Sequence, residues 1–204
     1  MQLRRSSLVR LRLLSDDVSR ARGMRDELPR AAERSRFVIE TARRVASARG
    51  FREVRTPVLE KRQLFERGLG AESDAVSKEL YVVEGETSLA LRPENTAGVV
   101  RALLEGDSER EDGESEAEHA ERRASVALPV RWYYEGEMFR RERPQRGRWR
   151  QFRQFGMEIF TGASFVERLC ADLEILSTGL AVLRELVGDA DLELQINTLG
   201  DAAS

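Results

Sequence analysis

Residues Arg131–Phe160 read RWYYEGEMFRRERPQRGRWRQFRQFGMEIF, and this stretch decides the fold. Apolar and aromatic residues alternate with polar ones on both sides of a polar loop, residues 141–150, which contains five arginines. Alternation at period 2 is the pattern of a half-buried strand. The stretch therefore predicts two antiparallel strands joined by an arginine-rich loop.

The two predicted strands each present one polar row. The row of the first strand contains Trp132, Tyr134, Gly136, Met138 and Arg140, and that of the second contains Phe152, Gln154, Gly156 and Glu158. The other face of the second strand carries Phe155, Met157 and Ile159. A ring, an amide and a carboxylate in one row indicate a binding floor, although a solvated face of a sheet is the alternative. Glycine in mid-strand often marks the close approach of a ligand or another backbone.

Composition bounds the class of protein. The chain has 204 residues, of which 41% are hydrophobic and 34% are charged, and its net charge is −2. No apolar run approaches the ~20 residues of a transmembrane helix, so we expect no membrane partner. One cysteine, Cys170, excludes an internal disulfide framework, and one histidine, His119, excludes a histidine-based metal cluster. Any nucleic-acid binding must come from local basic patches.

Two segments differ in composition from the rest. The first fifteen residues contain four arginines, three serines and no acid, which resembles an organelle transit peptide; an arginine-rich disordered or helical end is the alternative. Residues 106–125 are strongly charged without apolar periodicity, which predicts a disordered insertion. We expect a tail over 1–20 and one domain over 21–204. The expected location is the cytoplasm, with mitochondrion or plastid as the alternative.

The remaining pattern predicts helices on either side of a sheet. Helices are expected at Glu33–Arg49, with Phe37, Val38, Ala42, Val45 and Ala46 on one face, from Asn95 or Thr96 to Leu104, and at Phe165–Val187. Strands are expected at Phe51–Val58, at Leu80–Val83 and Ser88–Leu91 as a hairpin, and at Leu192, Leu194 and Ile196 as a closing strand. The predicted fold class is α+β, with a mixed and mostly antiparallel sheet.

The polar residues suggest chemistry on a phosphate. Fixed guanidinium groups such as Arg140 and Arg148 stabilise the charge that spreads over phosphate oxygens during transfer. Phe152 could stack a base, while Gln154 and Glu158 could bind a polar ligand. The segment Leu91–Ala97, LRPENTA, places a carboxylate and a hydroxyl where a strand meets a helix; an ordinary capping turn is the alternative.

Together these segments resemble the catalytic domain of class II aminoacyl-tRNA synthetases, in the histidyl branch. Arg22–Asp26 resembles the opening segment of that family, and the helix and strand through Pro57 resemble motif 1, which builds the family's dimer interface. LRPENTAG, Leu91–Gly98, resembles its substrate-binding turn, and FRRERPQRGRWRQFRQFGMEIF resembles motif 2. Residues Leu194–Gly200 resemble the strand that closes the family's central segment.

The resemblance implies ATP-dependent activation of histidine to histidyl-adenylate and transfer to tRNA(His). It also implies a homodimer, and ATP as a substrate together with Mg²⁺. We assign no protein side chains to a metal ion. The implied catalytic residue is Arg140. The implied ATP-binding residues are Arg140, Glu142, Arg148 and Phe152. The implied histidine-binding residues are Glu94, Asn95, Thr96, Arg140, Gln154 and Glu158.

The sequence also departs from the family pattern. The family continues beyond the segment that ends at Gly200 with a second histidine-binding segment, motif 3 and an anticodon-binding domain, so we expect the 204 residues alone to be inactive. Asn95 stands where the family usually has glycine. Two alternatives remain: a non-catalytic regulatory or sensor protein of synthetase fold, such as the regulator of an ATP phosphoribosyltransferase, and a class II synthetase for proline or threonine.

Overall fold

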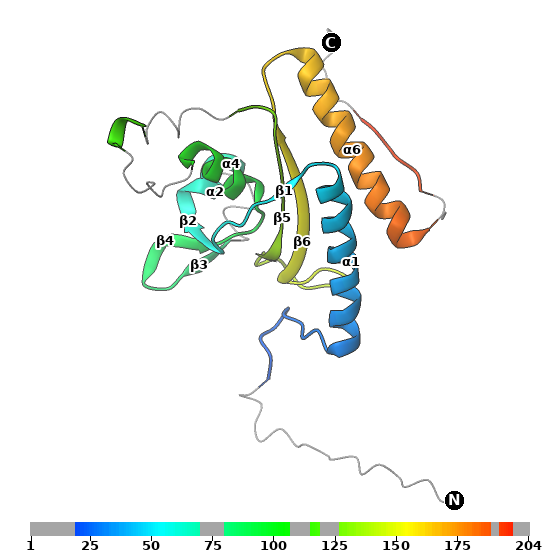
Figure 1. Ribbon diagram of the computed structural model, residues 1–204. Helices are drawn as coiled ribbons and strands as arrows, with labels where there is room; N and C mark the ends of the chain where they lie inside the picture. The colour runs from blue at the N-terminus through cyan, green and yellow to red at the C-terminus, as the bar shows by residue number, and fades with distance from the viewer. Residues whose placement is uncertain (1–18, 70–79, 107–114, 119–126, 189–191, 198–204) are drawn as a thin grey trace, which may run out of the picture.

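The computed structural model describes residues 19–69, 80–106, 115–118, 127–188 and 192–197 (Figure 1). The transit-like residues 1–15 lie outside the described residues, as does most of the charged insertion, including His119. Of that insertion, Gly106 and residues 115–118 are described, and 116–118 form a short helical turn. The Ser115 hydroxyl donates to the Glu118 carboxylate at 2.6 Å. The prediction of disorder for the insertion as a whole stays a prediction.

The central sheet is built on the predicted hairpin. Strand β5 (Val130–Phe139) pairs antiparallel with β6 (Gln151–Phe160), and the short β1 (Arg52–Glu53) pairs parallel with β5. The register sets Trp132 opposite Glu158 and Gly136 opposite Gln154. Directly opposed residues share a face of the sheet, so the two predicted polar rows form one surface.

A second small sheet lies beside the first. It contains β2 (Leu59–Lys61), β4 (Glu86–Leu91) and β3 (Tyr81–Val83) in the order β2-β4-β3, all antiparallel. The hairpin predicted over Leu80–Leu91 is thus confirmed.

The single strand predicted over Phe51–Val58 is wrong. The chain pairs with β5 only as β1 and then crosses to the second sheet. Pro57 has no backbone N–H and cannot donate a hydrogen bond to a neighbouring strand. The carbonyls of Thr56 and Val58 accept instead from the Arg92 side chain and the Arg92 backbone N–H, both at 3.0 Å.

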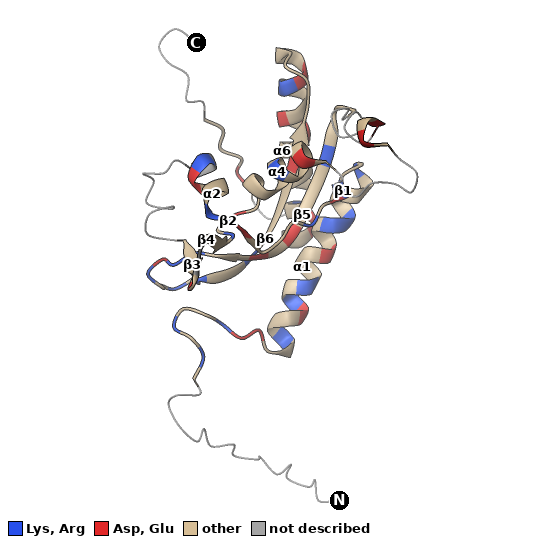
Figure 2. Ribbon diagram, turned by 90° about the vertical axis from the view of Figure 1, so that its left-hand side faces the viewer, with Lys and Arg blue, Asp and Glu red and all other residues tan. Residues whose placement is uncertain are grey.

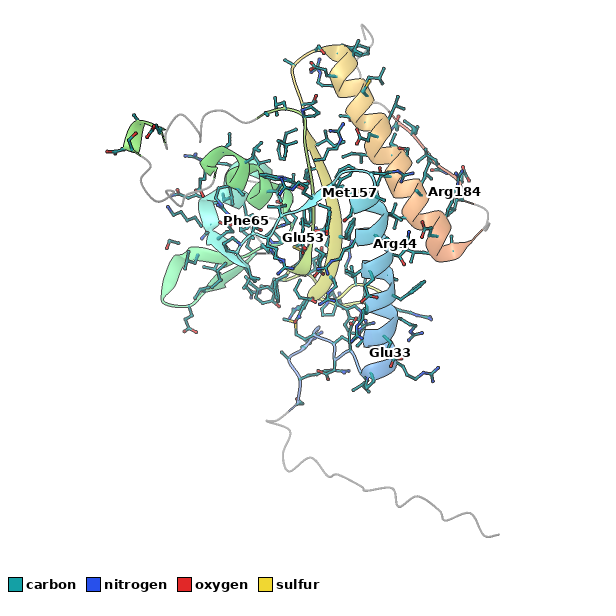
Figure 3. All side chains as sticks on the ribbon, in the orientation of Figure 1. Glu33, Arg44, Glu53, Phe65, Met157 and Arg184 are labelled. Carbon is teal, nitrogen blue, oxygen red and sulfur yellow. The ribbon has the colours of Figure 1, made fainter. Side chains whose placement is uncertain are left out.

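Two helices, α1 (Pro29–Ala48) and α6 (Phe165–Val187), cover one face of the hairpin. A core cluster of Ala46, Phe51 and Tyr133 is completed there by Phe155, Met157, Ile159 and Ile175. Figure 3 labels Met157 on the side of β6 that faces α1. An ion pair between Arg44 and Glu185 links the two helices, and charged residues follow α1 along its length (Figure 2). The apolar face predicted for α1 is only partly buried, because Phe37 and Val38 are 58% and 43% exposed.

Helices α2 (Arg62–Leu69) and α4 (Thr96–Glu105) lie on the side of the second sheet. Val99 of α4 packs with Tyr134 and Met138 of β5 in a buried cluster. This packing sets the N-terminus of α4 beside the polar row of the hairpin.

The predicted closing strand is wrong for the described residues 192–197. They form no strand, and Leu192, Leu194 and Ile196 are 39%, 45% and 73% exposed. Alternation defines a strand only where a neighbouring strand supplies hydrogen bonds, and among the described residues none pairs with this segment. The α+β class is unaffected. No helix in the described ranges combines the length and apolarity required to cross a bilayer.

Candidate active site

A buried arginine, Arg92, fixes the turn between β4 and α4. The Arg92 Nε donates to the Glu137 carbonyl at 3.0 Å, and its Nη1 donates to the Thr56 carbonyl at 3.0 Å and to Asn95 Oδ1 at 3.3 Å. Burial lowers the pKa of Arg92, and Glu135, Glu60 and Glu137 oppose that effect. The guanidinium thus joins the turn, the β1–β2 connection and β5 into one unit.

Asn95 belongs to the same buried network. Its side chain is 1% exposed, and its Oδ1 accepts from the Thr56 hydroxyl at 2.6 Å as well as from Arg92. Its amide oxygen therefore faces the interior and braces the turn, and the expectation that Asn95 binds histidine stays a prediction. It stands at the N-cap of α4 without a side-chain capping bond.

Glu94, and not Asn95, provides the side-chain cap of α4. One carboxylate oxygen accepts from the Thr96 backbone N–H at 2.6 Å, and the other accepts from the Ala97 N–H at 3.1 Å. A carboxylate at a helix N-terminus is stabilised by the unpaired N–H groups and the helix dipole. The capping turn that the sequence allowed is thus present, and Glu94 forms it.

Thr96 connects this turn to the hairpin. Its hydroxyl donates to Glu158 Oε1 at 2.9 Å. Burial raises the pKa of Glu158, the hydrogen bond from Thr96 opposes that effect, and the nearby Glu94 adds to it. Two carboxylates on one small surface favour a cationic ligand.

Gln154 belongs to the same row as Glu158, with Gly156 between them. Its Oε1 is buried and has no hydrogen-bond partner within the part of the chain that the structure describes. A buried amide oxygen without a partner costs ~1–3 kcal/mol, so this atom is suited to accept from a bound donor.

The two mid-strand glycines have a different explanation from the one predicted. A Cβ at Gly136 would overlap Nη2 of Arg92, and a Cβ at Gly156 would overlap Cζ and Oη of Tyr134. The close approach that the sequence indicated is real. In this structure it is made by side chains of the chain itself.

Arg140 stands where the row meets the loop. Its Nε donates to the Pro93 carbonyl at 3.0 Å, and its guanidinium carbon lies 5.1 Å from the centre of the Phe152 ring. Glu142, whose side chain is 11% exposed, contacts Arg148 at 2.9 Å and Arg140 at 4.0 Å. The structure brings these four residues together beside the turn that carries Glu94.

The N-terminal segment supports the same loop. The Gly23 carbonyl accepts from the Arg150 backbone N–H at 2.9 Å, and Arg25 lies over the Trp149 ring at 5.7 Å. A pocket of about 680 Å³ lies there, lined partly by Met24, Trp149 and Phe152. No pattern in the sequence predicts this contact, because it joins residues far apart in the chain.

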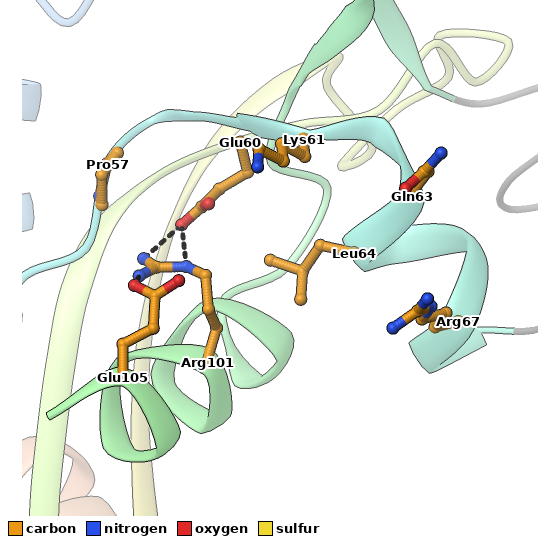
Figure 4. A pocket seen from close by; sticks show the side chains of 8 residues that line it. All are labelled: Pro57, Glu60, Lys61, Gln63, Leu64, Arg67, Arg101 and Glu105. Atoms are coloured by element: carbon orange, nitrogen blue, oxygen red, sulfur yellow. Dashed lines mark hydrogen bonds and ion pairs between the residues drawn. The ribbon is translucent and has the colours of Figure 1, made fainter. Parts of the chain in front are cut away.

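Two hollows lie on the side of α2 and α4, and one of them adjoins the turn. One, of about 780 Å³, is lined by Leu64, Arg67, Glu94, Thr96, Ala97, Val100, Arg101, Leu104 and Glu105. The other, of about 430 Å³, shares Leu64 and Arg67 with it and contains the ion pair of Arg101 with Glu60 at 2.7 Å (Figure 4). The candidate site therefore opens toward α2. Within the described residues, no group of three or more His, Cys, Asp or Glu side chains could hold a metal ion.

Comparison with known proteins agrees with this geometry. The sequence profile of the family described as histidyl-tRNA synthetase matches residues 23–113 and 115–200. A histidine–tRNA ligase from Latilactobacillus sakei is 43% identical over 185 residues, which are 90% of this chain and 38% of the relative. One from Halothermothrix orenii is 39% identical over 186 residues, 90% of this chain and 40% of the relative.

The fold comparison gives the same family. The structure of apo S. aureus histidyl-tRNA synthetase matches with a TM-score of 0.59 and 25% identity, covering 82% of this chain and 34% of that one. The chain thus spans about two fifths of the length of the relatives named here. On the profile, the relatives and the fold, this chain belongs to the histidyl-tRNA synthetase family.

Proposed function

We propose that this chain provides histidine-binding and ATP-binding residues of a histidine–tRNA ligase, which forms histidyl-adenylate and then histidyl-tRNA. The observation that carries the proposal is one junction. Thr96, next to the capping carboxylate, donates to Glu158 of the row, and Arg140 donates to the Pro93 carbonyl of the same turn. Groups suited to an amino acid and groups suited to a phosphate therefore meet at one place.

Histidine fits the carboxylate side of this junction. Its ammonium group would lie near Glu94 and would donate to Oε1 of Gln154, which has no hydrogen-bond partner among the described residues. Its imidazole N–H would donate to Glu158. A pocket that pairs buried polar groups with a substrate N–H rejects analogues that lack it.

The guanidinium side suits ATP, supplied as its Mg²⁺ complex. Arg140 would contact the α-phosphate and the histidine carboxylate, while Arg148 and Glu142 would contact the nucleotide and Phe152 would stack the adenine. The reaction needs no general base, because the attacking carboxylate is already ionised. It forms a bond from the carboxylate oxygen to the α-phosphorus and releases pyrophosphate. Arg140 would stabilise the charge that develops on the phosphate oxygens.

The partners of the whole protein belong to the same proposal. They are tRNA(His), which receives the histidyl group, and a second copy of the chain. The curated relatives are histidine–tRNA ligases, which supports the first. The exposed Phe37 and Val38 of α1 offer apolar surface for the second.

A hybrid ligase tests the function. Residues 21–200 of this chain would replace the corresponding part of the L. sakei relative, and histidine-dependent ATP–pyrophosphate exchange would be measured. We expect exchange that saturates with histidine and that Glu158→Gln weakens at least tenfold in kcat/KM for histidine, with KM for ATP within about twofold. Absence of exchange in a folded hybrid would reject the ligase and favour the regulatory alternative.

A further inference from the structure

A short segment that precedes α1, residues 22–25, lies against the loop that joins β5 to β6. The Gly23 carbonyl accepts from the Arg150 backbone N–H at 2.9 Å. The guanidinium of Arg25 lies over the Trp149 ring, with its carbon 5.7 Å from the ring centre. We call this segment the N-terminal strap, because it holds the loop by backbone and side chain together.

Arg150 joins the strap to both ends of the loop. Its Nη1 donates to the Arg22 carbonyl at 3.3 Å, and its Nε donates to the Glu142 carbonyl at 3.0 Å. Its own carbonyl accepts from the Arg140 backbone N–H at 2.9 Å. Residues 141–150 contain five arginines and one glutamate, and like charges held close together repel one another. A contact from outside the loop therefore stabilises one arrangement of these charges.

Gly23 makes the contact with the loop possible. Its φ is +84°, in the left-handed region that favours glycine. A Cβ at this position would lie 2.7 Å from Cδ of Arg150 and 2.8 Å from Cγ of Pro144. Any side chain at Gly23 would therefore push the strap and the loop apart.

Resting on the proposed function, we infer that the N-terminal strap is a positioning element for ATP. Glu142, whose backbone carbonyl accepts from Arg150, forms an ion pair with Arg148 at 2.9 Å, and this pair would contact the nucleotide. The strap thus fixes the side of the site that would bind ATP. The histidine side is held by other elements, since Thr96 of α4 donates to Glu158 of β6. Loss of the strap should weaken ATP binding and leave histidine binding unchanged.

The chain offers two variants of this contact, each with a matched control. Gly23→Ala adds the overlapping Cβ. Its control is Gly85→Ala, because Gly85 has the same φ of +84° and an added Cβ there meets nothing within 4 Å. Arg150→Lys keeps the positive charge but loses the planar fork that donates to two carbonyls. Its control is Arg146→Lys, in the exposed turn of the same loop.

The first readout is independent of activity. Amide hydrogen exchange would be followed by NMR in the 204-residue chain, where the Arg150 N–H reports its bond to the Gly23 carbonyl. We expect exchange at Arg150 to be at least tenfold faster in Gly23→Ala and within about twofold of the parent in Gly85→Ala. The Val54 N–H, which donates to the Tyr133 carbonyl at 2.9 Å, is the internal reference and should not change. Equal rates at Arg150 in the two variants would overturn the strap.

The second readout separates the inference from the function. In the hybrid ligase, Gly23→Ala and Arg150→Lys should each raise KM for ATP about three- to tenfold, the loss of about one hydrogen bond. KM for histidine should stay within about twofold, and both controls should match the parent. Active hybrids with unchanged KM for ATP would overturn the positioning role and leave the ligase standing.

A folded hybrid without exchange would reject the ligase, and the strap is then judged by binding alone. Calorimetry with Mg²⁺-ATP on the same hybrids gives Kd without turnover. A Kd that is higher in Gly23→Ala than in Gly85→Ala would support the strap. Equal values, or no binding by any of the hybrids, would overturn it.

Discussion

The guanidinium of Arg92 lies against the backbone of Gly136, where a Cβ atom would overlap its Nη2. Arg92 is 6% exposed and comes from the turn between β4 and α4, whereas Gly136 is in the middle of β5. The missing side chain at Gly136 therefore allows the turn to dock on the hairpin. This contact sets the distance between Glu94 on the turn and Gln154 on the sheet, since Gly136 pairs directly with Gln154.

Gly136→Ala should destabilise the fold by about 1–3 kcal/mol, the usual cost of overpacking a close contact. The added methyl group would displace a buried guanidinium from its carbonyl acceptors. Gly179→Ala is the control, because Gly179 lies within α6 and an added Cβ there meets nothing within 4 Å. That variant should gain about 0.5–1 kcal/mol. Urea denaturation measures both, and equal effects would contradict the docking role of Gly136.

Arg140→Ala in the hybrid ligase should lower kcat for pyrophosphate exchange about 10²- to 10³-fold, the typical loss when one preorganised donor to a developing charge is removed. Arg141→Ala is the control, since Arg141 is the exposed next residue of the same loop. It should stay within about twofold of the parent. Steady-state exchange kinetics at saturating histidine measure the effect. Comparable losses in both variants would point to general loop charge and not to Arg140.

Much of this site was predictable from local pattern, and the rest was not. Period-2 alternation gave the hairpin and its polar row, because a strand face depends on neighbours two residues apart. The helix Phe165–Val187 was also predicted with its observed bounds, and its N-terminus carries a capping box of Ser164 and Glu167. Both features are encoded within a few residues.

The features that local pattern could not predict involve contacts that are distant in sequence. The Asn95 side chain accepts from Thr56, which is 39 residues away in the sequence, and this contact turns it inward, while its role in binding histidine stays a prediction. Tyr134 was seen as one member of a row, and its packing with Val99 depends on how α4 docks on β5. No spacing rule reports such a docking, since it is decided by packing around Val99.

Glu158→Gln should stabilise the fold at neutral pH. The folded-state pKa of Glu158 is raised above its ordinary value, chiefly by burial. The native state therefore binds its proton more tightly than the unfolded state, and stability falls as pH rises from the unfolded pKa through the folded one. Glutamine removes this dependence. Urea midpoints measured from pH 4 to pH 8 should fall less steeply with pH in the variant. If the stability of the parent depended on pH across this window in the same way as that of the variant, the raised pKa of Glu158 would be contradicted.

Asn95→Ala should cost about 1–3 kcal/mol of stability. It removes Oδ1, the acceptor to which both the Thr56 hydroxyl and Arg92 Nη1 now donate. Asn95→Asp is the matched variant: it keeps the oxygen at the same position and places it near a guanidinium, so it should recover at least half of the loss. The two roles considered for Asn95 then separate in the hybrid ligase. If Asn95 only braces the turn, Asn95→Ala should be less stable, but its KM for histidine should change by less than about threefold when measured below the melting temperature. The reason is that Glu94 keeps its own hydrogen bonds to the Thr96 and Ala97 N–H groups. A ligand predicts the reverse, with unchanged stability and a large rise in KM, and that result would confirm Asn95 as a member of the histidine-binding set.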